Sequence, residues 1–192
     1  KKYNRALTFE EIDSVLNIKT VEETTELIQA LKELEEEIEI YHSNKDKYMI
    51  FENSNKRKGI MRTNKKGFGF VDISNQEEDI FVGMDNMNGA INGDTVLVEI
   101  LSNKPDGRIE GRIVRVVKRE LSTVVGEIYF KKGKGYLIPD DEKLKIKIEI
   151  PKGKNKGSVD GHKVVVKLTS RISNNRFNGE VIRILGHKND IG

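Results

Sequence analysis

Two kinds of hydrophobic spacing divide the chain. Before about residue 40, apolar residues recur every three or four positions, which is the spacing of a helix that buries one face. The stretches "TFEE" (8–11) and "TVEE" (20–23) have the form of capping boxes, so helices are predicted to begin near residues 8 and 20. The second helix carries an apolar stripe that is expected to be core: Leu27, Leu31, Leu34 and Ile38.

A hairpin is predicted after the second helix. The stretch "IEIYHSNKDKYMIF" (38–51) has two runs rich in β-forming residues around a turn at Asn44–Asp46. Helices followed by a short hairpin are typical of a winged-helix domain, which we predict over residues 1–52 with its first helix missing or incomplete. Because the chain starts at Lys1 and not at Met, we interpret it as part of a longer protein.

After a charged linker at 53–58, apolar and polar positions alternate as in β-strands, and the pattern occurs twice. The matching pairs are "KGFGFV" (66–71) with "KGKGYL" (132–137), "GAINGDTVLVEI" (89–100) with "GSVDGHKVVVKL" (157–168), and "EGRIVRVV" (110–117) with "NGEVIRIL" (178–185). Five short strands in about 65 residues favour a small OB-fold barrel, although an SH3-like barrel or a small sandwich fits the same pattern.

The predicted fold is therefore mostly β with an N-terminal α+β module. The winged helix is followed by two tandem OB-fold (cold-shock-like) five-stranded β-barrels. We place the first cold-shock/OB domain at 59–121 and the second at 122–188. Residues 189–192 would then begin the connection to a further domain.

The first repeat is predicted to place aromatic side chains outside its barrel. Side chains alternate between the two faces of a strand, so Phe68 and Phe70 share one face while Val71 and Ile73 lie on the other, towards the core. Phe81, in the next strand, is expected beside the two phenylalanines. A slip of one residue would bury the three rings, but it would expose the aliphatic residues of both strands instead. We therefore predict an exposed aromatic patch.

Such a patch indicates nucleic-acid binding, since aromatic rings stack on unpaired bases and nearby cations contact phosphates. The predicted nucleic-acid-binding residues of the first repeat are Phe68, Phe70, Phe81, Arg62, Lys65 and Lys66. In the second repeat, Lys134 and Tyr136 replace Phe68 and Phe70, and Lys147 is placed about where Phe81 lies. That barrel is expected to hold phosphates more than bases. Its predicted contacts are Lys132, Lys134, Tyr136, Lys145 and Lys147.

The distribution of charge narrows the class of partner. Residues 1–55 carry 7 Lys or Arg and 13 Asp or Glu, whereas residues 56–192 carry 27 and 18. A polyanion is therefore expected to bind the barrels. The second helix is rich in glutamate, which argues against duplex DNA as a partner of the winged helix and favours a packing, regulatory or protein-contact role.

The composition also excludes several kinds of site and of protein. The sequence has no cysteine and three scattered histidines, so disulfides and thiolate metal sites are excluded. We interpret Asp72 and Asp79 as strand-end and turn residues and not as a two-metal cluster, so we predict no catalytic residue, metal site or cofactor in this chain. There is no apolar run of about 18 residues and no export signal, so we expect a cytoplasmic protein without a membrane partner.

The residues just described resemble a known family. The stretches that carry the resemblance are "LTFEEIDSVLNI" (7–18), "GFGFV" (67–71), "DIFV" (79–82), "GAINGD" (89–94), "EGRIVRVVKRE" (110–120) and "VVGEI" (124–128). They are similar to the N-terminal part of bacterial ribonuclease R enzymes, in the ribonuclease II family. "GFGFV" alone would fit any cold-shock protein, but the order of modules and the second, degenerate barrel make the resemblance specific.

The resemblance implies a parent enzyme that degrades RNA from the 3′ end, with Mg²⁺ held by aspartates in a catalytic domain that lies outside this chain. The chain itself is expected to capture single-stranded RNA without cutting it. Two alternatives stay open. One is a stand-alone cold-shock RNA chaperone, and the other is a winged-helix nucleic-acid-binding regulator without nuclease activity.

Overall fold

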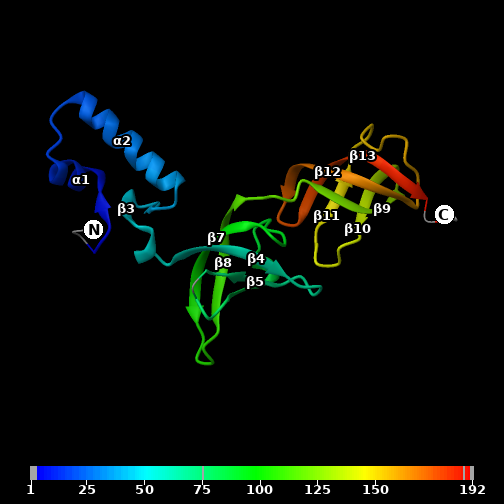
Figure 1. Cartoon of the computed structure of the whole chain (residues 1–192), viewed down its shortest axis with the longest axis horizontal. Coiled ribbons are helices and arrows are strands. Elements are labelled where there is room, and N and C mark those ends of the chain that lie inside the picture. The colour runs from blue at the N-terminus through cyan, green and yellow to red at the C-terminus, as the bar shows by residue number, and fades with distance from the viewer. Residues whose placement is uncertain (1–3, 75, 188, 191–192) are drawn as a thin grey trace. The chain divides into compact units, whose positions relative to one another are not determined.

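The computed structural model describes residues 4–74, 76–187 and 189–190. The chain divides into two units, with the boundary between Arg57 and Lys58 (Figure 1). Residues 191 and 192, at the end of the predicted connection 189–192, lie outside the described residues. Each unit is described by itself below.

The first unit combines two helices with a three-stranded antiparallel sheet of order β1-β3-β2. Its elements are β1 (Leu7–Thr8), α1 (Phe9–Leu16), α2 (Val21–Glu36), β2 (Ile40–His42), β3 (Lys47–Ile50) and the 3-10 helix η1 (Phe51–Asn53). Both helices begin where the sequence predicts, because Thr8 and Thr20 form complete capping boxes with Glu11 and Glu23. The predicted hairpin is β2 paired with β3. The unit is a small helix-and-sheet module.

The predicted apolar stripe of α2 is correct in the middle of the helix and wrong at its end. Leu27 and Leu31 are buried, but Leu34, in the last turn, is exposed. Ile38 lies beyond the end of the helix at Glu36, with a left-handed backbone (φ 60°). The stripe stops because the helix stops, so Ile38 does not continue the helical face that buries Leu27 and Leu31.

The second unit contains two closed five-stranded barrels of the OB type, as the repeat predicts. The strand order is β4-β5-β6-β8-β7 in the first and β9-β10-β11-β13-β12 in the second. The first barrel consists of β4 (Lys56–Thr63), β5 (Gly69–Asp72), β6 (Ile80–Val82), β7 (Thr95–Asn103) and β8 (Ile109–Lys118), with the 3-10 helix η2 (Met84–Asn86). The second consists of β9 (Thr123–Lys131), β10 (Lys134–Pro139), β11 (Lys147–Ile150), β12 (His162–Ser173) and β13 (Arg176–His187).

Alternation fills both barrels with aliphatic side chains. Val71 and Ile80 are completely buried in the first barrel, and Ile148 and Val166 occupy the core of the second. Every second residue of these strands points inward, so the residues between them must point outward.

Strand β4 begins at Lys56, inside the segment 53–58 that the sequence predicts to be a linker.

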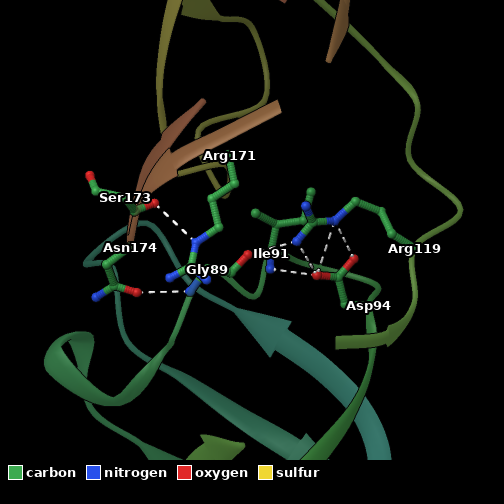
Figure 2. Close-up of polar contacts among 7 residues, drawn as sticks. All are labelled: Gly89, Ile91, Asp94, Arg119, Arg171, Ser173 and Asn174. Carbon is green, nitrogen blue, oxygen red and sulfur yellow. Dashed lines mark hydrogen bonds and ion pairs between the residues drawn. The ribbon is translucent and has the colours of Figure 1, made fainter. Parts of the chain in front are cut away.

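The turn at 89–94 of the first barrel enters the core of the second. Ile91 is 2% exposed and belongs to the second barrel's core cluster. Asp94 is 1% exposed, accepts the Ile91 backbone N–H at 2.9 Å and pairs with the Arg119 guanidinium at 2.7 Å (Figure 2). The turn is therefore held in place by the hydrogen bond to the buried Asp94 carboxylate and by the packing of Ile91 in the core of the second barrel.

Arg119 lies in the segment that connects the barrels and contacts both. It donates to the Gly89 carbonyl at 2.6 Å, and its guanidinium lies 5.2 Å from the centre of the Phe177 ring of the second barrel. Asn174 accepts the Gly89 N–H at 2.8 Å (Figure 2). Gly89 has a φ of 77°, and a Cβ there would lie 2.5 Å from Nε of Arg171, so the position suits only glycine.

We predict that Asp94→Ala lowers the free energy of unfolding by about 1.5–3 kcal/mol, because hydrogen bonds to a buried charge are lost and Arg119 loses its carboxylate. Asp140→Ala is the matched control. Asp140 pairs with Lys163 at 2.6 Å, but both side chains are exposed, and such pairs contribute less than about 1 kcal/mol. Urea unfolding of the three proteins measures the difference. Equal losses in the two variants would contradict the role given to Asp94.

Candidate nucleic-acid interface

The three phenylalanines of the first repeat form one cluster, which we call the aromatic platform (Phe68, Phe70 and Phe81). The ring centres of Phe68 and Phe70 lie 5.4 and 5.5 Å from that of Phe81, and 6.1 Å from each other. Phe70 lies opposite Phe81 in the β5–β6 pair and is 37% exposed, whereas the adjacent Val71 is completely buried. The predicted strand register is therefore correct, and the rings face away from the core.

Cations border the platform. Arg62 on β4 lies opposite Phe70. The Arg108 guanidinium lies 5.4 Å from the centre of the Phe81 ring. A hollow of about 370 Å³ beside Phe70 is lined by Glu78, Asp79 and residues 106–109. The sequence analysis missed Arg108, because only the parallel pairing of β6 with β8 brings it next to Phe81.

The lysines at the edge of the first repeat face the second barrel. Lys65 forms an ion pair with Glu142, and this hydrogen bond raises the pKa of Lys65 and lowers that of Glu142. Lys66 and Lys145 come from different repeats, yet both line a cavity of about 450 Å³, together with Lys143. Packing of the barrels thus gathers cations that the sequence analysis assigned to separate surfaces.

The outward face of the second barrel differs from the prediction. The sequence analysis placed Lys147 about where Phe81 lies, but Glu149 is the residue opposite Tyr136, as Phe81 is opposite Phe70. The segment between the two paired positions is two residues longer in the second repeat, which shifts the equivalence. Lys132 lies exposed in the β9–β10 turn, and Lys147 is exposed on β11.

Glu149 is nearly buried and holds two cations. The Lys134 ammonium lies 3.0 Å and the Arg176 guanidinium 2.6 Å from its carboxylate oxygens. The hydrogen bond from Arg176 lowers the pKa of Glu149, although burial opposes this. Lys134, predicted to contact phosphate, is therefore partly neutralised by a carboxylate of its own barrel.

A second aromatic residue lies beside Tyr136. Tyr129 on β9 is directly opposite it, and the rings are stacked with centres 5.3 Å apart and planes 20° apart. The sequence analysis counted one aromatic residue on this face. Aligning Tyr129 with Arg62 of the first repeat would have revealed the second, because both lie opposite the central aromatic residue of their barrel.

Neither a metal cluster nor a membrane span is found in the part of the chain that the structure describes. No three His, Asp or Glu side chains there are grouped so that they could hold a metal ion. Among the same residues, no helix has the length and apolar character needed to cross a bilayer.

We predict that Glu149→Gln lowers the free energy of unfolding by about 1–2 kcal/mol near pH 7, because charged hydrogen bonds to Arg176 and Lys134 are weakened. The folded-state pKa of Glu149 lies below its ordinary value of 4.5. Its contribution is therefore complete above pH 4.5 and is lost as the pH falls through the lowered pKa. The gap between the wild type and Glu149→Gln should close over that range in urea titrations. A gap that is independent of pH would contradict this account. Glu180→Gln, at an exposed pair with Lys154, is the control.

Two family models match the second unit. Residues 59–116 match the ribonuclease B OB domain, and residues 136–192 match the cold shock domain. Ribonuclease R of Escherichia coli is 29% identical over 186 residues, which are 96% of this chain and 23% of that protein. Ribonuclease R of Vibrio parahaemolyticus is 32% identical over 164 residues, 83% of this chain and 20% of that protein. The chain spans about a fifth to a quarter of the length of these relatives.

Solved structures share the fold. Mycoplasma genitalium RNase R in complex with ribose methylated single-stranded RNA has a TM-score of 0.61 at 18% identity, covering 69% of this chain and 22% of that one. Yeast Ssd1, a pseudonuclease, has a TM-score of 0.62 at 19% identity, covering 71% and 23%. The resemblance to ribonuclease R that the sequence suggests is thus confirmed over most of the chain.

Proposed function

We propose that this chain binds single-stranded RNA, with the aromatic platform stacking on bases and the bordering cations contacting phosphates. The observation that carries the proposal is the gathering of Phe68, Phe70 and Phe81 on the outward side of a barrel whose inward side is fully packed. Aromatic rings that stay exposed to water do not gain the free energy of burial. An unpaired base is flat, so stacking on the rings removes their faces from water. Arg62 and Arg108 lie where they can meet the phosphates of such a strand.

We further propose that the chain captures RNA for a 3′–5′ exoribonuclease of the ribonuclease R type, with Mg²⁺ serving the hydrolytic step elsewhere in such an enzyme. The similarity to ribonuclease R along most of the chain supports this role. We propose that the cold-shock/OB domains span 59–121 and 122–188. The two barrels, with strands between Lys56 and Lys118 and between Thr123 and His187, support this division.

The first unit is proposed to be a winged-helix domain, residues 1–52, that contacts a protein and not duplex DNA. Its helices and small antiparallel sheet suit that fold. Helix α2 carries glutamates along its length and exposes Val21 and Ile28, a combination that repels phosphates and fits an apolar or basic protein surface.

We predict that Phe70→Leu weakens binding to an unstructured RNA by about 1–3 kcal/mol, the usual contribution of one stacked base. The slope of log affinity against log salt should stay the same, because no charge is removed. The unfolding midpoint should change little, since the ring is partly exposed. Leu101→Ala, at an exposed position of β7, is the control and should bind as the wild type does. Unchanged affinity for Phe70→Leu, or a loss explained by unfolding, would contradict the platform.

We predict that deletion of residues 1–52 leaves the salt slope nearly unchanged. The deleted part carries 7 Lys or Arg and 13 Asp or Glu, so it has a net negative charge. The cations that release counterions from RNA would then all lie in the barrels. Fluorescence anisotropy with labelled RNA over a range of salt concentrations measures the slope. A slope that collapses on deletion would place the phosphate contacts in the first unit.

A further inference from the structure

We infer that the second barrel carries its own base-stacking site, formed by Tyr129 and Tyr136, so that the chain holds single-stranded RNA at two aromatic sites. The inference deepens the proposed function and rests on it. It changes the expected role of the second barrel, which sequence reasoning limited mainly to phosphate contacts.

The ring geometry is that of a surface on which a base can stack. Tyr129 is 38% exposed, Tyr136 is half-buried, and their rings are nearly parallel. Both side chains point outward, because the neighbouring Phe130 and Leu137 pack into the barrel core. The Lys134 ammonium lies 5.9 Å from the centre of the Tyr136 ring, so a nucleobase would extend the stack on the more exposed Tyr129 ring.

The position of the pair matches that of the platform in the first barrel. Tyr136 occupies the place of Phe70, the central aromatic residue of the second strand. In the first barrel, the ring directly opposite it comes from Phe81 on the third strand, whereas in the second barrel it comes from Tyr129 on the first strand. Both barrels therefore have two opposed rings at this central position. The second ring comes from the third strand in the first barrel and from the first strand in the second barrel.

Cations beside the tyrosines favour RNA as the occupant. Lys131 and Lys134 are directly opposite each other at the end of the β9–β10 hairpin, on the same face as the rings. Like charges placed opposite one another are unfavourable without an anion. Glu149 pairs with Lys134, but among the described residues no carboxylate forms an ion pair with Lys131. A phosphate next to a stacked base would complete this arrangement. Residues 121–192, with 15 Lys or Arg and 8 Asp or Glu, attract a polyanion.

The competing explanation is that the two tyrosines only stabilise the pairing of β9 with β10. If the tyrosines only stabilise the strand pairing, a variant that folds normally should keep its affinity for RNA. If they stack on a base, loss of an aromatic ring should weaken RNA binding even when folding is unaffected. Replacement by leucine keeps apolar bulk but removes the aromatic face, and replacement by phenylalanine keeps the face. The test therefore compares Tyr129→Leu and Tyr136→Leu with Tyr129→Phe and Tyr136→Phe in the full chain. Ile182→Ala, at an exposed aliphatic position of β13, is the control.

Affinity for labelled oligouridine is measured by fluorescence anisotropy at fixed salt, with urea unfolding in parallel. The leucine variants should bind at least about fivefold more weakly, while the phenylalanine variants and Ile182→Ala stay within about twofold of the wild type. The chain has no tryptophan, so Tyr136→Trp introduces a single indole. Its fluorescence should be quenched when RNA binds.

The outcomes separate this inference from the proposed function. Leucine variants that bind as the wild type does, while Phe70→Leu is weakened, would overturn the second site and leave RNA binding by the platform intact. If neither change weakens binding, the proposed function fails as well. A loss of affinity that only follows a loss of folded protein, or an indole that RNA does not quench, would also overturn the second site.

Discussion

The buried ion pair between Arg119 and Asp94 organises the region where the two barrels meet. A carboxylate that is almost completely shielded from water is stable only when cations and N–H groups surround it. Here Arg119 and the Ile91 N–H supply them, and the same turn carries the Ile91 side chain into the core of the second barrel. The second core is therefore completed by a residue of the first repeat, so the barrels are joined by shared packing and not by the connecting segment alone.

This packing also decides which cations can act together. Lys66 and Lys145 would belong to separate surfaces on isolated barrels, but they line one cavity in the packed pair. Lys65 is partly neutralised by Glu142 of the other barrel. The charge available to a phosphate is thus set by the contact between barrels as much as by the number of lysines in each repeat.

The sequence was sufficient for the features that depend on local periodicity. Alternation identified the strands, both barrels and the outward side of Phe70, because a period of two decides which face a side chain occupies. It was insufficient where neighbours come from distant strands. Arg108 became visible only once β6 was paired with β8, which is not its neighbour in the chain. Tyr129 lies opposite Tyr136 in a local hairpin, and it was missed because it was not aligned with Arg62 of the first repeat. Glu149 was missed because two extra residues before it shift the register without disturbing the alternation. The apolar stripe of α2 was extended too far, to Leu34 and Ile38, because the spacing of apolar residues does not show that the helix ends at Glu36.

The two repeats show how one barrel can support different surface chemistry. Where the first has Phe81, the second has Glu149, and a nearly buried carboxylate there must be neutralised. Lys134, which replaces Phe68, and Arg176 provide the compensating charges. The loss of two rings is thus coupled to the gain of an ion-paired cluster, and Tyr129 restores an aromatic partner from the opposite side. These changes lie at outward positions, so both barrels keep a packed apolar interior while their outward faces differ in charge and in aromatic residues.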